Sequence, residues 1–229
     1  NKNIFYCIYN MNLMAATLRG DLHEVDRLLD ISPNSCYWKN YRGYTALIAA
    51  AQKGHDSIVS RLIAKDADVN HVADDGATAL AIAAQYGHAN VVDKLISEDA
   101  DVNHVGLHGA TALLLAAQNG HDSIVSRLIA NDANVNHAAD NGDTALYIAA
   151  QNGHDSIVRK LINEGANTEN IEFFCPIDYP YCNDSNNSCY GIKEGENYSR
   201  PRGFLWESQD GCKYDYRMGL EEPSTSTSA

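Results

Sequence analysis

The sequence has no long apolar run, and it has few basic residues for its acidic content. No stretch approaches the roughly 20 apolar residues that span a bilayer, and the apolar segment 4–8 is short. That segment leads directly into a set of internal repeats, so we expect neither a membrane helix nor a cleaved signal peptide. Met11 is a candidate start of the natural chain.

The charge balance narrows the class of partner. The 229 residues contain 17 Lys and Arg against 30 Asp and Glu, a formal charge of −13. Nucleic-acid binding depends on the neutralisation of phosphates by Lys and Arg, so we expect no nucleic-acid partner and no anionic membrane. The acidity either serves solubility alone or favours a protein partner with a basic surface.

The chain also lacks a recognisable catalytic or metal-binding set. No nucleophile, base and orienting group occur in a pattern typical of an enzyme, and there is no C-x2-C pair. His71, His104 and His137 recur at one position, and we expect them about 10 Å apart, as packed helices are. One zinc ion cannot bridge that distance with bonds of about 2 Å. We therefore expect no enzyme activity, no metal and no cofactor.

The cysteines leave the compartment open. Cys7 and Cys36 are isolated, as expected for reduced thiols. The last quarter of the chain has four cysteines and three N-x-S sequons, which are Cys175, Cys182, Cys189, Cys212, Asn183, Asn186 and Asn197. Four cysteines allow three disulfide pairings, and paired cysteines with used sequons would mean a secreted protein. Asn/Ser-rich sequence also produces sequons by accident, and we favour a cytoplasmic or otherwise intracellular protein.

An internal repeat dominates the chain. The phrase QKGHDSIVSRLI at 52–63 returns as QYGHANVVDKLI from residue 85, QNGHDSIVSRLI from 118 and QNGHDSIVRKLI from 151, 33 residues apart each time. TAL and (D/N)VNH keep the same period. A fixed period of this length indicates stacked supersecondary units rather than one globular core.

The residues of one unit predict two helices and a hairpin. The repeated threonines can cap a first helix, and the repeated glycines can end it with a left-handed turn; they are Thr45, Thr78, Thr111, Thr144, Gly54, Gly87, Gly120 and Gly153. Ile58, Val59, Leu62 and Ile63 give a second helix one broad apolar face. Gly76, Gly109 and Gly142 follow in polar turns, which we expect to be hairpin tips.

These motifs resemble the ankyrin repeat, whose usual form is G-x-T-P-L-H-x-A-A-x-x-G-H-x-x-I-V-x-x-L-L-x-x-G-A-D-V-N. The resemblance covers about residues 12–170 and implies an all-α repeat solenoid of about five units with short hairpins. Expected units are 11–42, 43–75, 76–108, 109–141 and 142–170, after an extension at 1–10. The first unit is atypical, because one residue is inserted within 32–41. His55, His88, His121 and His154 occupy the family's G-H position, which implies a structural hydrogen-bonding role.

The chain departs from the family pattern at the start of the first helix. The family's proline is Ala46, Ala79, Ala112 and Ala145 here, and its histidine is Ile48, Ala81, Leu114 and Tyr147. The helix should form, because alanine is a good helix former, but hydrogen bonds of that histidine are missing. We expect a folded array that is not especially rigid.

The repeat pattern breaks at 167–169, and residues 171–229 form an irregular, Tyr-rich tail. We expect Ile171, Phe173 and Phe174 to cover the open end of the last unit and residues 223–229 to be disordered.

In the ankyrin family, targets bind the concave face made by hairpin tips and first helices. By position, that face has varied tips and nearly uniform helix ends here. Its candidate binding residues are Tyr41, Arg42, Tyr44, Lys53, Asp74, Asp75, Tyr86, Leu107, His108, Asn119, Asp140, Asn141, Asp143 and Asn152. The three tyrosines are the best anchors, because aromatic residues dominate binding hot spots. The aspartates would select a basic partner.

The resemblance implies a non-enzymatic protein-interaction module, expected to be monomeric. The alternative is an adaptor or effector in which the repeats select a target and the tail carries or recruits the activity.

Overall fold

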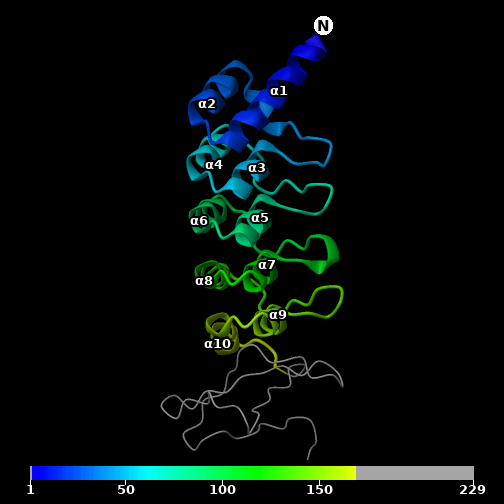
Figure 1. Cartoon of the computed structure of the whole chain (residues 1–229), viewed down its shortest axis with the longest axis vertical. Helices are drawn as coiled ribbons and strands as arrows, with labels where there is room; N and C mark the ends of the chain where they lie inside the picture. The colour runs from blue at the N-terminus through cyan, green and yellow to red at the C-terminus, as the bar shows by residue number, and fades with distance from the viewer. Residues whose placement is uncertain (1, 169–229) are drawn as a thin grey trace, which may run out of the picture.

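The computed structural model describes residues 2–168, which form a single-file stack of helix pairs (Figure 1). The described elements are α1 (Lys2–Arg19), α2 (Leu22–Ile31), η1 (Pro33–Tyr37), α3 (Ala46–Lys53), α4 (Asp56–Ile63), α5 (Ala79–Tyr86), α6 (Ala89–Ser97), η2 (Leu107–Gly109), α7 (Ala112–Gln118), α8 (Asp122–Ala130), α9 (Ala145–Gln151) and α10 (Asp155–Asn163). Residues 2–168 contain no β-strand, only isolated bridges at two hairpins. The expected all-α repeat solenoid is confirmed.

Each first helix begins at a capping threonine. The hydroxyl oxygens of Thr45, Thr78, Thr111 and Thr144 accept hydrogen bonds from the backbone N–H three residues later. These bonds satisfy a donor that has no partner inside the helix. Each first helix ends where the chain turns left-handed, as at Gly54 with φ 69° and Gly87 with φ 83°. The caps and turns predicted from the sequence are therefore present.

Close packing between units depends on small residues. Ala83 and Ala84 of α5 are fully buried, and the same alanine pair is buried in α3 and α7. A methyl side chain lets neighbouring first helices approach closely. The second helices contribute larger side chains, such as Val59, Leu62 and Leu95, which are also fully buried. Ile63, expected on the buried face, is only half-buried.

The first unit differs from the others at both ends. Helix α1 begins at Lys2, so one helix crosses the expected boundary between residues 10 and 11. After α2, the chain forms the short helix η1, where later units have a turn with positive φ at Asp66, Asp99 or Asp132. The inserted residue is accommodated in this segment, within the range that the sequence predicted.

Side chains after the second helices α4, α6 and α8 join neighbouring units. The Nδ2 of Asn70 donates to Asp99 O at 3.0 Å, and its Oδ1 accepts from Asp101 N at 2.8 Å. Asn103 and Asn136 repeat both bonds one and two units later. The adjacent His71 bonds in the other direction, to Gly43 O at 2.8 Å. The three asparagines thus each hold the next unit, whereas the histidine ties the end of its own unit back to the hairpin glycine that begins it.

Candidate functional site

The hairpins all project from the same side of the stack, next to the first helices (Figure 1). Polar residues shape the tips: the Oδ1 of Asp75 accepts from Ala77 N at 3.2 Å, and Asn141 makes the same bond to Asp143 N at 3.1 Å. The glycine of each tip has positive φ, as at Gly76 with 74°. The third tip differs, because His108 also has positive φ, 58°, within helix η2.

Neighbouring tips touch through their backbones. Asp74 N donates to Arg42 O, and Asp140 N donates to His108 O, each at 3.1 Å. Between these two contacts, a Cβ at Gly76 would lie 2.6 Å from Leu107 N. The varied tip side chains therefore lie along one continuous edge of the stack, formed by the four hairpin tips.

The candidate residues of the sequence lie on this edge and at the C-terminal ends of the first helices. Most are exposed, and Tyr44 and Asp143 are only half-buried. Those on the tips and the adjoining positions are Tyr41, Arg42, Tyr44, Asp74, Asp75, Leu107, His108, Asp140 and Asn141, with Asp143 just after the fourth tip. Those that end or follow first helices are Lys53, Tyr86, Asn119 and Asn152.

The structure brings Tyr44 and Asp75 together from successive hairpins. The Tyr44 hydroxyl donates to Asp75 Oδ2 at 2.7 Å. Burial of the phenol, together with this bond to a carboxylate, raises the pKa of Tyr44 to about 12. Tyr44 thus joins two units as well as lying at the surface. Its hydroxyl is therefore less available to a partner than the sequence suggested.

The other two tyrosines are more open. Tyr41 is 87% exposed, and the guanidinium of Arg42 lies 5.7 Å from its ring centroid. Tyr86 is 50% exposed; its hydroxyl accepts from Gln52 Nε2 at 3.2 Å, and its ring is nearly parallel to that of His88. Both side chains are thus more exposed than that of Tyr44, which is half-buried.

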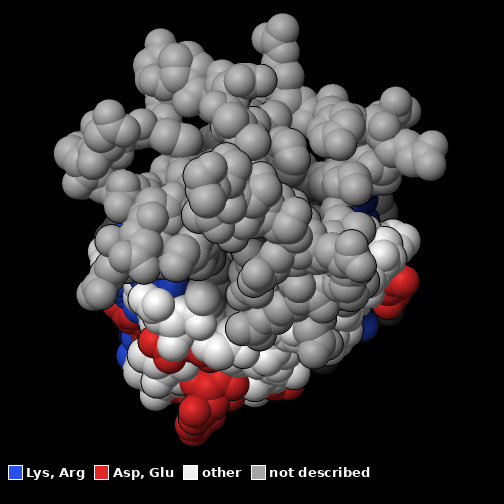
Figure 2. Space-filling model, turned by 90° about the horizontal axis from the view of Figure 1, so that it is seen from below, with Lys and Arg blue, Asp and Glu red and all other residues white. Residues whose placement is uncertain are grey.

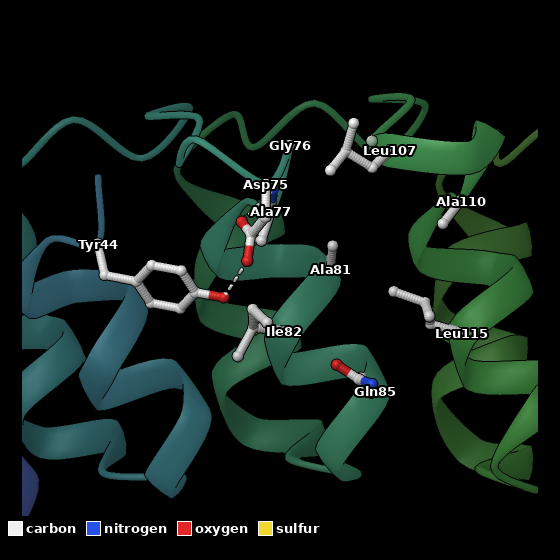
Figure 3. Close-up of a pocket in the computed structure, with 11 residues that line it drawn as sticks. Tyr44, Asp75, Gly76, Ala77, Ala81, Ile82, Gln85, Leu107, Ala110 and Leu115 are labelled. Atoms are coloured by element: carbon white, nitrogen blue, oxygen red, sulfur yellow. Dashed lines mark hydrogen bonds between the residues drawn. The ribbon is translucent and has the colours of Figure 1, made fainter. Parts of the chain in front are cut away.

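A shallow hollow of about 160 Å³ lies between the second and third tips (Figure 3). Asp75 and Leu107 come from the tips, and Ala81, Ile82 and Leu115 come from α5 and α7. The sequence predicted the tip residues but not the helix residues, which looked like ordinary core positions. A usable signal was Gly106, which stands where two other hairpins have Ala73 and Ala139.

Three cations on the second helices form ion pairs with the preceding unit. Arg61 pairs with Asp26 and Asp30, Arg127 with Asp93, and Lys160 with Asp122. The last pair holds the pKa of Asp122 below its ordinary value, chiefly through the hydrogen bond from Lys160.

The tip acids have no such neutralisation. Within residues 2–168, no Lys, Arg or His nitrogen lies within 4.0 Å of a carboxylate oxygen of Asp74, Asp75, Asp140 or Asp143. Asp and Glu also cover more of the visible described surface than Lys and Arg when the molecule is viewed from below (Figure 2). The charges of the tip aspartates are therefore not offset by ion pairs with any of the described residues.

Three histidines of the G-H position bond the previous unit. His88, His121 and His154 each place Nε2 3.0–3.1 Å from a glutamine carbonyl of the previous unit, as at His88 with Gln52 O. Carbonyl oxygens only accept, so these nitrogens carry the proton. His55 is the exception, because its Nε2 is buried without a partner. Within the described residues, no three His, Cys, Asp or Glu side chains could hold a metal ion together.

Comparison with known families agrees with this architecture. A family model described as ankyrin repeats (3 copies) matches residues 13–106 and 103–171. The chain belongs to the ankyrin-repeat family. Ankyrin repeats generally act as protein-interaction modules, and their domains are typically non-enzymatic. The comparison with curated proteins gave no match.

In the described part of this ankyrin array, no helix is long and apolar enough to cross a membrane. The expectations for the tail lie outside the described residues: the cover formed by Ile171, Phe173 and Phe174, the state of its four cysteines, and the disorder of 223–229.

Proposed function

We propose that the hairpin tips and first-helix ends of this ankyrin array bind a protein partner with a basic surface. The observation that carries the proposal is the uneven pairing of charge. Arg61, Arg127 and Lys160 of the second helices are held by acids of the preceding unit. The tip aspartates are not paired, so the field on the hairpin side attracts cations.

Exposed apolar side chains lie beside these charges. Tyr41, Tyr86 and Leu107 are each at least half exposed. Aromatic and apolar side chains supply most of the binding free energy at interfaces, whereas charges at the rim mainly set association rate and selectivity. The edge therefore combines both elements of a protein-binding surface.

The test is affinity capture from cell lysate with mass spectrometry, using the full chain as bait. The tip variant has Asp74, Asp75 and Asp140 changed to asparagine. Asn141 already occupies the position of Asp75 in the fourth tip, so the turns should form. The control variant loses equal charge elsewhere, with Asp68, Asp101 and Asp132 changed to asparagine.

The control is matched, because Asn134 naturally occupies the position of Asp68 and Asp101 and makes the same turn bond. Asp132 has positive φ, which asparagine also tolerates. We expect a partner that binds the wild type and the control but not the tip variant, and that is released by added salt. A partner held equally by all three baits would contradict the proposal.

A further inference from the structure

The hollow beside Asp75 is too small for an ordinary small-molecule ligand. It holds about 160 Å³, whereas ligand pockets have about 300–1,000 Å³. Its open, partly apolar form suits one side chain of a partner protein. Because the hollow lies on the edge that we propose to bind a partner, its assignment to a ligand rests on that proposed function.

We propose that this hollow accepts an arginine side chain of the partner, with its guanidinium on Asp75. The apolar part of the lining comes from Ile82, Leu107 and Leu115 (Figure 3). Long cationic side chains pack their methylenes along apolar surface and keep the charged head at a polar edge.

The hydrogen bonds of Asp75 favour arginine over lysine. Its Oδ1 accepts from Ala77 N at 3.2 Å and its Oδ2 from Tyr44 Oη at 2.7 Å. An ionised carboxylate has about four acceptor positions, so one remains on each oxygen. Two acceptors side by side match the two parallel N–H groups of a guanidinium, whereas an ammonium is a single point charge.

The carboxylate is also held in place before binding. The bonds from Tyr44 and Ala77 fix both of its oxygens, so little ordering remains to be done when the guanidinium arrives. Gly76 and Gly106 form the wall between the tips, and a Cβ at Gly106 would lie 2.9 Å from Gly76 O. The glycine at 106 thus permits the close approach that closes one side of the hollow.

The test is an NMR titration of the full chain with acetyl-Gly-Arg-Gly-amide. Parallel titrations use the lysine peptide and the peptide of citrulline, which keeps the shape of arginine without its charge. We expect saturable shifts of the amide signals of Gly76, Ala77, Gly106 and Ala110 with the arginine peptide. The lysine peptide should bind more weakly, and the citrulline peptide should cause no shift.

Asp75→Asn should weaken binding of the arginine peptide at least about tenfold, because a charge-assisted pair is lost. Asp101→Asn removes the same charge at a position outside the tips, where Asn134 makes the same turn bond one unit later, and should change the affinity less than about twofold. Leu107→Ser, at an exposed position, should weaken binding by loss of the apolar wall without disturbing the fold.

Equal affinity of Asp75→Asn and wild type, or of the arginine and lysine peptides, would overturn the inference. Shifts confined to the fourth tip, around Asp140, would overturn it while supporting a general acidic binding edge. Loss of a captured partner from the tip variant, without any effect of Asp75→Asn alone, would also overturn the inference and leave the proposed function standing.

Discussion

The asparagines between units offer a direct measure of how strongly neighbouring repeats are joined. Asn103 Nδ2 donates to Asp132 O at 2.9 Å, and its Oδ1 accepts from Asn134 N at 2.8 Å. Asn103→Ala removes both bonds. Each is worth about 1 kcal/mol net, and the exposed partners can bind water instead, so we expect a loss of about 2 kcal/mol in the free energy of unfolding.

The assay is urea unfolding followed by far-UV circular dichroism, with the melting temperature as a second readout. For a chain of this size, a loss of about 2 kcal/mol lowers the melting temperature by about 4–8 °C. Asn103→Asp keeps the acceptor but places a carboxylate oxygen against the Asp132 carbonyl. We expect it to lose at least half as much stability as the alanine variant.

The matched control is Asn90→Ala, an exposed asparagine of α6 whose side chain makes no hydrogen bond to another described residue. Alanine is the better helix former, so this change should be neutral or slightly stabilising. If Asn103→Ala falls within about 0.5 kcal/mol of Asn90→Ala, the bonds between units do not hold the stack together.

Three further predictions use the same unfolding assay. Gly87→Ala should cost more than Gly142→Ala, because both have positive φ but only at Gly87 would the new Cβ meet a neighbour, 2.7 Å from His121 Cε1; equal losses would mean that only backbone strain matters. Leu95→Ala should cost about 2–5 kcal/mol, because this side chain is fully buried in α6, and a loss below about 1 kcal/mol would show that the core is loosely packed. The raised pKa of Tyr44 means that its contribution to stability is complete below about pH 10 and is lost as pH rises towards 12; Tyr44→Phe should lack this part of the alkaline loss, and identical pH profiles would contradict the assignment.

Much of the fold was predictable, because the repeat supplies several independent copies of each local signal. A threonine before an apolar run and a glycine after it define a helix through neighbouring residues alone. The sequence did not predict the N-terminal part of α1, because residues 2–10 have no counterpart in the other units.

The contacts between units could not be read from the sequence. Asn70 bonds residues 29 and 31 positions away, and Asn103 and Asn136 do the same in later units. Such partners are known only once the stacking register is known. The recurrence of these residues was visible, but their roles were not.

The candidate site shows the same division. The positions of the tips were predicted, because turns are variable where the helices are uniform, and the binding role of their residues stays a prediction. The pairing of Tyr44 with Asp75 and the hollow behind it depend on how two successive hairpins lean together, and no local pattern encodes that.

The placement of Asn and His side by side has a consequence for how such a chain can change length. Each of the units 43–75, 76–108 and 109–141 has an asparagine that bonds the next unit and a histidine that bonds the hairpin glycine of its own unit. Unequal recombination within the near-identical stretches would therefore delete or add a whole unit, and the remaining units would keep their bonds to their neighbours. Only the backbone carbonyl of the tip glycine takes part in these bonds, so the tip side chains can differ in an added unit without any change in the frame that supports them.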